Sequence, residues 1–543
     1  MWDFAIDGDA RWREPAAVRF DRRIRVPFAP EAPASGINDR GLYRCVWYRR
    51  HVTLPHAGGG RLLLNFGAVD HAATVWVDGT EVARHEGGYA PFSADVTAFA
   101  GGERALVVRA YDDPSDLEMP RGKQDWEAEP HAIWYPRTTG IWQTVWLEAV
   151  PRSSVVSVRW WTDDLRTLSF DASLEARDGA RLTAELRENG ELVARVAERA
   201  SAGHVRGAVA IANAPALRWS PDHPRLIEAA LELRDDDRVD RARSYAALRT
   251  VRTSGGKVVL NGEPYPLRMA LDQGYWPDGG LSAPDDAALA RDVELARALG
   301  FNGVRKHQKA EDPRWLEQCD RLGLLVFDEM PSPRVFGERA KRRLIGEWRE
   351  IVERDRSHPA VVAWVPFNES WGVEDLDGSQ AEVAHVSEVR DLTRELDPTR
   401  PVISNDGWQW VGGDVIGIHD YATDPAVLRA RYGTASALAR TLANERPEGR
   451  RLLLAPHQGE PVLLSEFGGL RIGDDEGWGY ATVAPNELVG RYAELCEAAR
   501  SDALAGFCYT QLTDTYQERN GLLRMDRTPK APIAELRAAT GGI

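Results

Sequence analysis

The sequence has 543 residues, which suggests three or four domains at about 150 residues each. It carries 68 lysines and arginines against 83 aspartates and glutamates, and the formal net charge of −15 disfavours nucleic acid and anionic membranes as partners, because both would repel it. No apolar run approaches the ~18 residues that a membrane span needs. The N-terminus lacks the basic region and apolar core of a signal peptide, and the four cysteines lack metal-ligand spacing, so we expect a cytoplasmic protein with reduced thiols.

Residues 1–150 have the pattern of antiparallel β-structure. Strand-like runs cover residues 61–66, 105–112 and 142–150, and no convincing helical period of 3.6 residues interrupts them. Asp78-Gly79 lies between two β-rich runs, and this pair indicates a hairpin because a tight type I′ turn needs two residues that tolerate positive φ. The first domain is therefore predicted to be a β-sandwich.

Residues 151–252 continue as β-structure with a different composition. Their apolar runs follow one another at the short intervals of a small sandwich of immunoglobulin type, and Asn189-Gly190 is a second hairpin signal. We place the boundary with the next domain within residues 250–256.

Residues 253–543 alternate between strand-like and helix-like runs. One helix has clear end signals, with Asp312 as N-cap, Pro313 in the first turn and Gly323 as the stop. Eight repeats over about 290 residues fit a (β/α)8 barrel. The predicted strands are 266–272, 302–307, 324–329, 361–369, 401–406, 414–420, 461–466 and 505–511.

Almost every predicted barrel strand ends in a polar or ionisable residue. The carboxyl ends of barrel strands converge on one face, where barrel enzymes have their active sites. The pattern therefore predicts a catalytic face built from Asp272, His307, Glu329, Glu369, Asp406, His419 with Tyr421, Glu466 and Gln511.

The chemistry of this face is that of carboxylates. The sequence has no Gly-rich phosphate loop after a strand, no G-x-S-x-G elbow and no H-E-x-x-H motif, which disfavours phosphoryl transfer, serine hydrolysis and zinc hydrolysis. Paired carboxylates near aromatic residues suit glycoside hydrolysis, in which one carboxyl group is protonated and the other ionised. The 19 tryptophans suit sugar binding but also suit sandwich cores.

Glu369 and Glu466 are the leading pair, at the ends of the fourth and seventh predicted strands. Asn368 is placed to bind a substrate hydroxyl, and Trp371 to form a platform for a sugar ring. The alternative for each glutamate is a salt-bridged carboxylate at a strand end, and three other carboxylates compete for the catalytic roles: Asp272, Glu329 and Asp406.

Several segments in chain order carry a family resemblance. They are NFGAVDHAATVWVDGTEVARHEGGYAPFSADVT (65–97), RTTGIWQTVWLE (137–148), VVLNGEPYPLRMALDQGYWP (258–277), GFNGVRKHQKAEDPRWLEQCDRLGLLVFDEMP (300–331), VAWVPFNESWG (362–372), LLSEFGG (463–469) and YTQLTDTYQERNGLLRMDRTPK (509–530). With these segments the chain resembles glycoside hydrolase family 2, the family of β-galactosidases, β-glucuronidases and β-mannosidases. The resemblance implies an N-terminal jelly roll (1–150), an immunoglobulin-like sandwich (151–252) and a catalytic (β/α)8 TIM barrel (253–543).

The resemblance also implies roles for individual residues. Glu369 matches the general acid/base, Glu466 the nucleophile, and Tyr421 the tyrosine that steadies the nucleophile. Asn368 then holds the sugar 2-hydroxyl. Further substrate-binding candidates are Asp272, His307, Asp406, Trp408, His419, Trp371 and Gln511. No metal and no cofactor is expected.

The identity of the sugar is the open part of this expectation. Members that take glucuronic acid bind its carboxylate with an Asn-x-Lys motif, whereas residues 518–522 here read ERNGL without the lysine, leaving Arg519 or Lys306 as substitute cations. The sequence therefore favours a neutral glycone, galactose first, with glucuronic acid, mannose, glucose and arabinopyranose as alternatives.

Three further points stay open. A non-catalytic carbohydrate-binding protein is the alternative of another class. Loop 112–136 is either solvated or leans over the barrel mouth. Homo-oligomers are common in the family that the chain resembles, and the sequence does not reveal whether this protein forms one.

Overall fold

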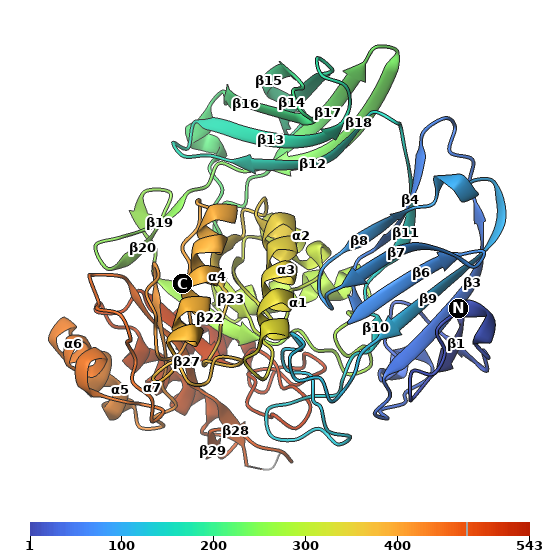
Figure 1. Cartoon of the computed structure of the whole chain (residues 1–543). Helices are drawn as coiled ribbons and strands as arrows, with labels where there is room; N and C mark the ends of the chain where they lie inside the picture. Colours follow the sequence, from blue (N-terminus) through green and yellow to red (C-terminus); the bar gives the residue numbers. More distant parts are fainter. Residues whose placement is uncertain (474–475, 543) are drawn as a thin grey trace.

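The computed structural model describes residues 1–473 and 476–542 (Figure 1). Two β-sandwiches are followed by a larger α/β part, as the sequence predicts. In Figure 1 the first sandwich lies beside the α/β part and the second lies above it.

The first sandwich is built from a six-stranded antiparallel sheet, with strand order β2-β1-β3-β9-β6-β7, and a three-stranded sheet, with order β11-β4-β8. Asp78 and Gly79 have φ of +48° and +80°, which confirms the predicted tight turn between β6 and β7. The strands are β1 (Trp2–Ile6), β2 (Arg22–Ile24), β3 (Cys45–Leu54), β4 (Arg61–Phe66), β5 (Val69–Asp70), β6 (Ala72–Val77), β7 (Thr80–Glu86), β8 (Phe92–Asp95), β9 (Gly102–Tyr111), β10 (Gly140–Ile141) and β11 (Val145–Val150).

The second sandwich packs a sheet of order β12-β13-β16 on a sheet of order β15-β14-β17-β18. Asn189 and Gly190, with φ of +48° and +84°, form the second predicted hairpin turn, between β14 and β15. The strands are β12 (Ser154–Trp161), β13 (Thr167–Glu175), β14 (Arg181–Glu188), β15 (Glu191–Arg199), β16 (His204–Ala210), β17 (Ile227–Asp235) and β18 (Arg238–Ala246). A small sheet of β19 (Val251–Ser254), β20 (Lys257–Leu260) and β21 (Glu263–Pro264) leads into the barrel.

The barrel sheet is parallel, with strand order β25-β24-β23-β22-β30-β27-β26. Its strands are almost entirely buried, as strands covered by helices on the outside must be. They are β22 (Leu267–Asp272), β23 (Gly303–Lys306), β24 (Leu325–Glu329), β25 (Val361–Val365), β26 (Ile416–His419), β27 (Val462–Gly468) and β30 (Gly506–Thr510). A short pair, β28 (Leu470–Ile472) with β29 (Ala481–Val483), follows β27.

Segment 401–406, which the sequence predicts to be the fifth barrel strand, is not a regular strand. It lies between β25 and β26, where Ile403 N–H donates to the Trp364 carbonyl at 2.9 Å and Asp414 N–H donates to the Val402 carbonyl at 2.8 Å. Its ladder is reduced to isolated bridges, between Trp364 and Val402 and between Asn368 and Asp406, and Pro401 has no N–H to donate. The segment still occupies the position between the two outer strands of the sheet.

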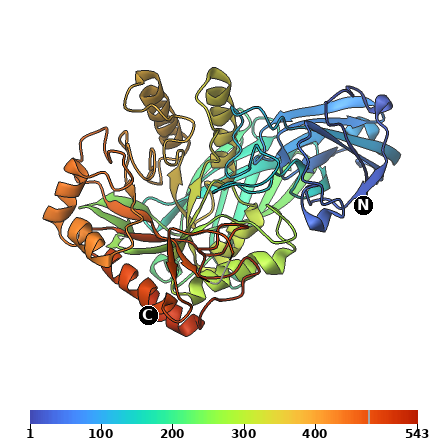
Figure 2. The same ribbon diagram turned by 90° about the horizontal axis from the view of Figure 1, so that it is seen from below.

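Helices surround the barrel sheet, as Figure 2 shows from below. Asp312 caps α2 by accepting from Arg314 N–H, and Gly323 ends it with φ of +78°, which confirms both predicted signals. The helices are α1 (Asp286–Ala298), α2 (Pro313–Leu322), α3 (Glu338–Asp355), α4 (Gln380–Leu396), α5 (Pro425–Tyr432), α6 (Ala435–Asn444), α7 (Leu488–Ala499) and α8 (Ile533–Thr540). Helices α5 and α6 both lie between β26 and β27 along the chain. Among the described residues, no helix has both the length and the apolar character needed to cross a membrane.

The first sandwich and the barrel share a hydrophobic core. Tyr89, Tyr135 and Trp142 of the sandwich belong to the same buried cluster as the apolar side chains of the barrel strands. The indole N–H of Trp142 donates to the Gly88 carbonyl, and Tyr89 N–H donates to Glu347 of α3. This packing fixes the segment between β9 and β10 against the barrel.

Candidate active site

Glu466 lies near the carboxyl end of β27, and both oxygens of its buried carboxylate accept hydrogen bonds. Arg305 Nη1 donates to Oε1 at 2.7 Å, and the Tyr421 hydroxyl donates to Oε2. Burial alone would raise the pKa of Glu466, but the positive charges of His419 and Arg305, with the Tyr421 hydrogen bond, lower it to about 2. Glu466 is therefore an ionised and firmly positioned carboxylate at neutral pH.

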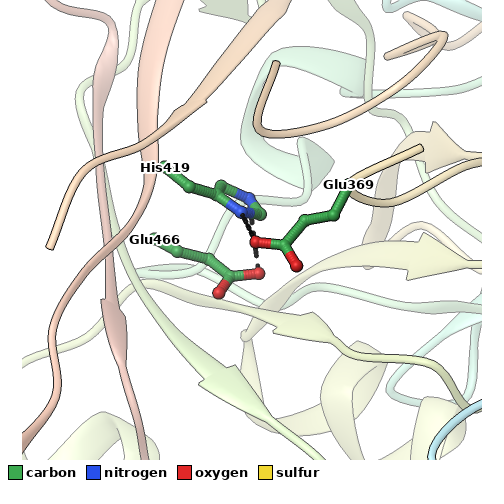
Figure 3. Close-up of side chains that lie close together, drawn as sticks. All are labelled: Glu369, His419 and Glu466. Carbon is green, nitrogen blue, oxygen red and sulfur yellow. Dashed lines mark hydrogen bonds and ion pairs between the residues drawn. The ribbon is translucent and has the colours of Figure 1, made fainter. Parts of the chain in front are cut away.

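Glu369 follows β25 and its backbone lies in the left-handed region, with φ of +51°. A conformation that side chains rarely adopt persists only where its surroundings hold it, and here Glu369 N–H donates to the Asp406 carbonyl at 2.9 Å. One carboxylate oxygen of Glu369 and one of Glu466 lie within 4.8 Å of each other (Figure 3). Carboxyl groups about 5 Å apart leave room for a sugar carbon and no room for an additional water molecule between them.

His419, at the end of β26, lies between the two glutamates (Figure 3). Its Nδ1 is 2.7 Å from Glu369 Oε1, and its Nε2 is 3.3 Å from Glu466 Oε1. Burial alone would lower the pKa of His419, but the charge of Glu466 and hydrogen bonds with Asp406 and Glu369 raise it to about 10. The imidazolium therefore places a positive charge beside both glutamate side chains. A contact of His419 with substrate stays a prediction.

Arg305, which was not among the residues singled out from the sequence, contacts several of the predicted site residues at once. Its fully buried guanidinium donates to Glu329 and Glu466, each at 2.7 Å, and forms an ion pair with Asp406 at 3.0 Å. It also donates to Asn368 Oδ1 at 2.5 Å. The signal was an arginine inside the predicted barrel strand 302–307, since a buried guanidinium needs several acceptors around it.

Two predicted substrate-binding side chains have unused donors. Asn368 Nδ2 and Trp408 Nε1 are buried and have no hydrogen-bond partner within the described parts of the chain. Because Asn368 Oδ1 accepts from Arg305, the amide orientation is fixed and its NH2 group stays available. Buried polar groups without partners are uncommon, and donors beside Glu369 and Glu466 suit sugar hydroxyls.

Asp272 and Gln511 use their polar atoms within the protein. Asp272 Oδ2 is 2.6 Å from Lys306 Nζ, and its Oδ1 accepts from Gly274 N–H. Gln511 accepts from Gln273 and donates to Asn520. A direct contact of either residue with substrate stays a prediction. Lys306, considered above as a substitute cation, is held by Asp272 and by Glu311 at 3.0 Å.

His307 and Asp406 both lie against the Arg305 network. His307 Nδ1 is 2.9 Å from Glu329 Oε1. Asp406 accepts from Ser465 Oγ at 2.7 Å, and the charge of Arg305, with the hydrogen bond to His419, holds its pKa below the usual range although burial opposes this. Both residues therefore lie close to Glu369 and Glu466, and Asp406 is part of the charged network around Arg305.

Loop 112–136 leans onto the barrel, which decides between the two interpretations left open by the sequence. The Tyr135 hydroxyl donates to Glu518, and Gln517 Nε2 donates to the Trp134 carbonyl at 2.7 Å. The rings of Trp134 and Trp371 have centroids 4.9 Å apart. Trp371 is thereby fixed beside Glu369 by an aromatic contact from the first sandwich.

Glu369, His419 and Glu466 are close enough together to resemble a metal-ligand group. Their hydrogen-bonding argues against it, because Arg305 and Tyr421 already occupy both oxygens of Glu466 and His419 Nδ1 already binds Glu369. The positive charges of Arg305 and His419 would also repel a cation. The three side chains are better suited to proton transfer and nucleophilic attack.

Two family models match the chain: "Glycosyl hydrolases family 2, sugar binding domain" over residues 25–162, and "Glycosyl hydrolases family 2, TIM barrel domain" over residues 282–468. A β-galactosidase from Thermoanaerobacter pseudethanolicus is 28% identical over 66% of this chain and 48% of its own length, so the chain spans about half of that relative. A β-glucuronidase from Paenibacillus borealis is 24% identical over 100% of this chain and 96% of its own. The solved structure of Bifidobacterium dentium β-glucuronidase complexed with coumarin-3-O-glucuronide is similar in fold, with a TM-score of 0.81, 22% identity, and coverage of 100% of this chain and 96% of that one.

Proposed function

The chain belongs to glycoside hydrolase family 2, and on this premise we propose that it is a retaining exo-β-glycosidase that releases a terminal sugar. The observation that carries the proposal is the pair Glu369 and Glu466, with oxygens within 4.8 Å of each other. A retaining mechanism needs one ionised and one proton-donating carboxyl group about 5 Å apart, one on each side of the scissile bond. The alternative of a non-catalytic binding protein gives no reason for this arrangement.

In the first step Glu466 attacks the anomeric carbon while Glu369 protonates the departing glycosidic oxygen. The bond from Glu466 to the sugar forms as the bond to the leaving group breaks, which leaves a covalent glycosyl-enzyme. Arg305 and Tyr421 hold the two oxygens of Glu466 in place for the attack. Asn368 Nδ2 is the donor that we assign to the sugar 2-hydroxyl, a contact that strengthens in the transition state.

In the second step Glu369, now a carboxylate, removes a proton from water. The resulting nucleophile attacks the anomeric carbon from the face that the leaving group has vacated, and Glu466 is released as a carboxylate. Two inversions at the same carbon give overall retention of configuration. His419 Nδ1, 2.7 Å from Glu369 Oε1, holds the side chain of Glu369 in place for this step.

The sequence favours galactose as the glycone, and galactose is the first of two candidates. The Thermoanaerobacter relative named β-galactosidase supports it, and the Paenibacillus relative named β-glucuronidase supports an acidic glycone as the second candidate. A buried lysine in the loop before β10, described below, is the specific observation that favours the second candidate.

A panel of p-nitrophenyl glycosides tests the proposed function. We expect release of p-nitrophenol from at least one of the β-galactoside, β-glucuronide, β-mannoside, β-glucoside and α-L-arabinopyranoside, with retention of configuration in the first-formed sugar. The anomer is identified by NMR immediately after mixing. An inverted product would contradict the double displacement. Silence across the panel, together with no labelling of Glu466 by a 2-deoxy-2-fluoro sugar, would favour the binding-only alternative.

Replacement of Tyr421 by phenylalanine should move the acidic limb of the pH profile. The variant loses the hydroxyl that donates to Glu466, so the pKa of Glu466 rises above about 2 and the nucleophile becomes protonated at a higher pH. We expect the acidic limb of kcat/KM to shift upward. A hydrogen bond to a charged group contributes about 1.5–3 kcal/mol, so kcat should fall about 10- to 100-fold.

Tyr432→Phe is the matched control for this variant. Tyr432 is also buried and its hydroxyl donates to a carboxylate, Asp420, at 2.7 Å, but it has no contact with the catalytic glutamates in the described structure. We expect this variant to keep the wild-type acidic limb. The same shift in both variants would mean that the effect is a general loss of stability.

A further inference from the structure

Lys123, in the loop between β9 and β10, places its ammonium group among aromatic rings. Lys123 is 5% exposed. Its Nζ lies 5.2 Å from the ring centroid of Trp371 and 5.8 Å from the ring centroids of Trp134 and Tyr135. Within residues 1–473 and 476–542, its ammonium forms no hydrogen bond and no ion pair. The contacts of the Lys123 ammonium are therefore those of a cation with π faces.

The buried lysines of the barrel differ from Lys123, because each of them forms an ion pair with a carboxylate. Lys306 is 2.6 Å from Asp272, Lys309 is 2.8 Å from Glu311, and Lys530 is 2.7 Å from Asp514. A buried cation is costly unless an anion compensates for its lost hydration. Lys123 is the exception among these lysines, and an anion from outside the chain would complete its environment.

The backbone holds Lys123 rigidly against the barrel. Gly122 N–H donates to the Ser332 carbonyl at 3.2 Å, and Tyr135 N–H donates to the Lys123 carbonyl at 2.9 Å. A Cβ on Gly122 would lie 2.2 Å from the carbonyl oxygen of Gln308, and φ of Gly122 is +58°, so only glycine permits this approach. Gln308, which Gly122 approaches, is the residue immediately after His307 in the barrel.

The position of Lys123 is that of a residue facing the catalytic site. Trp371, the nearest of the three rings, comes two residues after Glu369. Burial lowers the pKa of Lys123, while the carboxylates of Glu518, Glu466 and Glu369 raise it, which places the ammonium in the field of the catalytic pair without ion-pair contact to either glutamate.

Glu518 does not remove the need for an external anion. Its Oε2 accepts from Tyr135 and its Oε1 accepts from Asn520, so both oxygens are used within the barrel and the first sandwich. A neutral hydroxyl would give Lys123 a hydrogen bond but no opposite charge. A carboxylate supplies both, and its single charge matches the single unpaired ammonium.

We propose that Lys123 binds the carboxylate of a hexuronic acid held at Glu369 and Glu466, and is the specificity-determining residue of the site. The first sandwich thus contributes a substrate-binding residue to the barrel, and the preferred glycone is an acidic sugar. This inference rests on the proposed glycosidase function and decides between its two glycone candidates in favour of the second.

Pairs of substrates that differ only at C6 test the inference. The rates compared are those for p-nitrophenyl β-D-glucuronide against the β-D-glucoside, and for the β-D-galacturonide against the β-D-galactoside. We expect the wild-type protein to have at least a 10-fold higher kcat/KM for the acid of one pair. Lys123→Met, which keeps most of the length of the side chain without its charge, should lower kcat/KM for that acid about 100-fold and change kcat/KM for the neutral partner less than about 3-fold. Lys123→Arg should recover part of the activity on the acid, and all variants should keep the wild-type melting temperature within a few degrees.

Labelling experiments separate failure of this inference from failure of the proposed function. A 2-deoxy-2-fluoro uronosyl fluoride should label Glu466 in the wild-type protein and much more slowly in Lys123→Met. Labelling by the neutral 2-deoxy-2-fluoro sugar alone, or an equal loss of acid and neutral activity in Lys123→Met, would overturn the inference and leave the glycosidase intact. No labelling by either reagent would overturn both.

Discussion

Glu466→Gln should abolish turnover of every glycoside, including aryl glycosides with good leaving groups. Glutamine has nearly the same size but no negative charge, so the covalent intermediate does not form and leaving-group chemistry does not compensate. Removal of a catalytic nucleophile typically costs about 10⁴-fold or more in kcat. The measurement is kcat for the best p-nitrophenyl glycoside of the panel, with intact-protein mass spectrometry after incubation with the matching 2-fluoro sugar. We expect a mass increase for the wild-type protein and none for the variant.

The expected loss is chemical and not a loss of fold. Arg305 keeps Glu329 at 2.7 Å and Asp406 at 3.0 Å when the charge of Glu466 is removed, so the guanidinium remains compensated. The melting temperature of Glu466→Gln should therefore stay close to that of the wild type, which differential scanning calorimetry can check.

Glu347→Gln is the matched control, because it makes the same substitution at another buried glutamate. Burial raises the pKa of Glu347 to about 8, so this side chain is largely protonated at neutral pH, and glutamine resembles that form. Glu347 lies on α3 and accepts from Tyr89 of the first sandwich. We expect near wild-type activity. More than about 1% residual activity in Glu466→Gln, or a fluorosugar attached to another carboxylate such as Asp406, would show that the nucleophile is assigned wrongly.

An azide experiment adds a stereochemical criterion. In Glu466→Gly the side chain is removed, and azide can occupy the face from which the glutamate attacks. Addition of sodium azide with an activated β-glycoside should restore product formation, and the product should be the α-glycosyl azide because a single inversion has occurred. A β-glycosyl azide would contradict the assignment of Glu466 to that face.

The sequence was most informative where a local signal or a strand end determines the outcome. The pairs Asp78-Gly79 and Asn189-Gly190 form the predicted turns because positive φ at both positions is a local requirement. Glu369 and Glu466 come together because parallel strands bring their carboxyl ends to one face, whatever the loops between them do.

The sequence was less informative where the outcome depends on distant partners. Arg305 contacts Asn368 and Glu466, which lie 63 and 161 residues away along the chain, and no local pattern encodes such a network. Asp272 ends a strand as predicted, but whether its oxygens bind a sugar or a neighbouring lysine depends on Lys306 of the next strand. Loop 112–136 has no apolar period, and its place is determined by tertiary contacts such as that of Gly122 with Gln308.

The irregular segment 401–406 shows the same limit in the backbone. Its apolar residues followed by Asn405 and Asp406 match a barrel strand, yet the ladder breaks after Val402. Pairing is retained at Asp406, which bridges Asn368, and there the carbonyl of Asp406 accepts from Glu369 N–H and holds Glu369 in its left-handed conformation. The departure from the predicted strand therefore occurs next to the contact that positions Glu369, the proposed acid/base.

Glu369→Gln should affect substrates according to their leaving groups, in contrast to Glu466→Gln. General acid catalysis typically contributes about 10²- to 10⁴-fold, and it matters most when the leaving group is a poor one. We therefore expect kcat/KM to fall by about that factor for a disaccharide or alkyl glycoside, and by less than about 10-fold for a 2,4-dinitrophenyl glycoside, which departs without protonation. The second step loses its base with every substrate, so kcat should fall even for the activated glycoside and a burst of dinitrophenol should precede the slow steady state.

The order of these effects identifies the role of Glu369. Azide bypasses the missing base by attacking the glycosyl-enzyme directly, so it should raise kcat of the variant with the activated substrate and give the β-glycosyl azide, the opposite anomer from that expected for Glu466→Gly. Glu374→Gln, which changes an exposed glutamate further along the same loop, should behave as the wild type on both substrates. An equal fall of kcat/KM on both substrates, without a burst, would mean that Glu369 positions the sugar and does not transfer a proton. Because the His419 imidazolium is 2.7 Å from Glu369, that outcome would make His419 the next candidate for the acid.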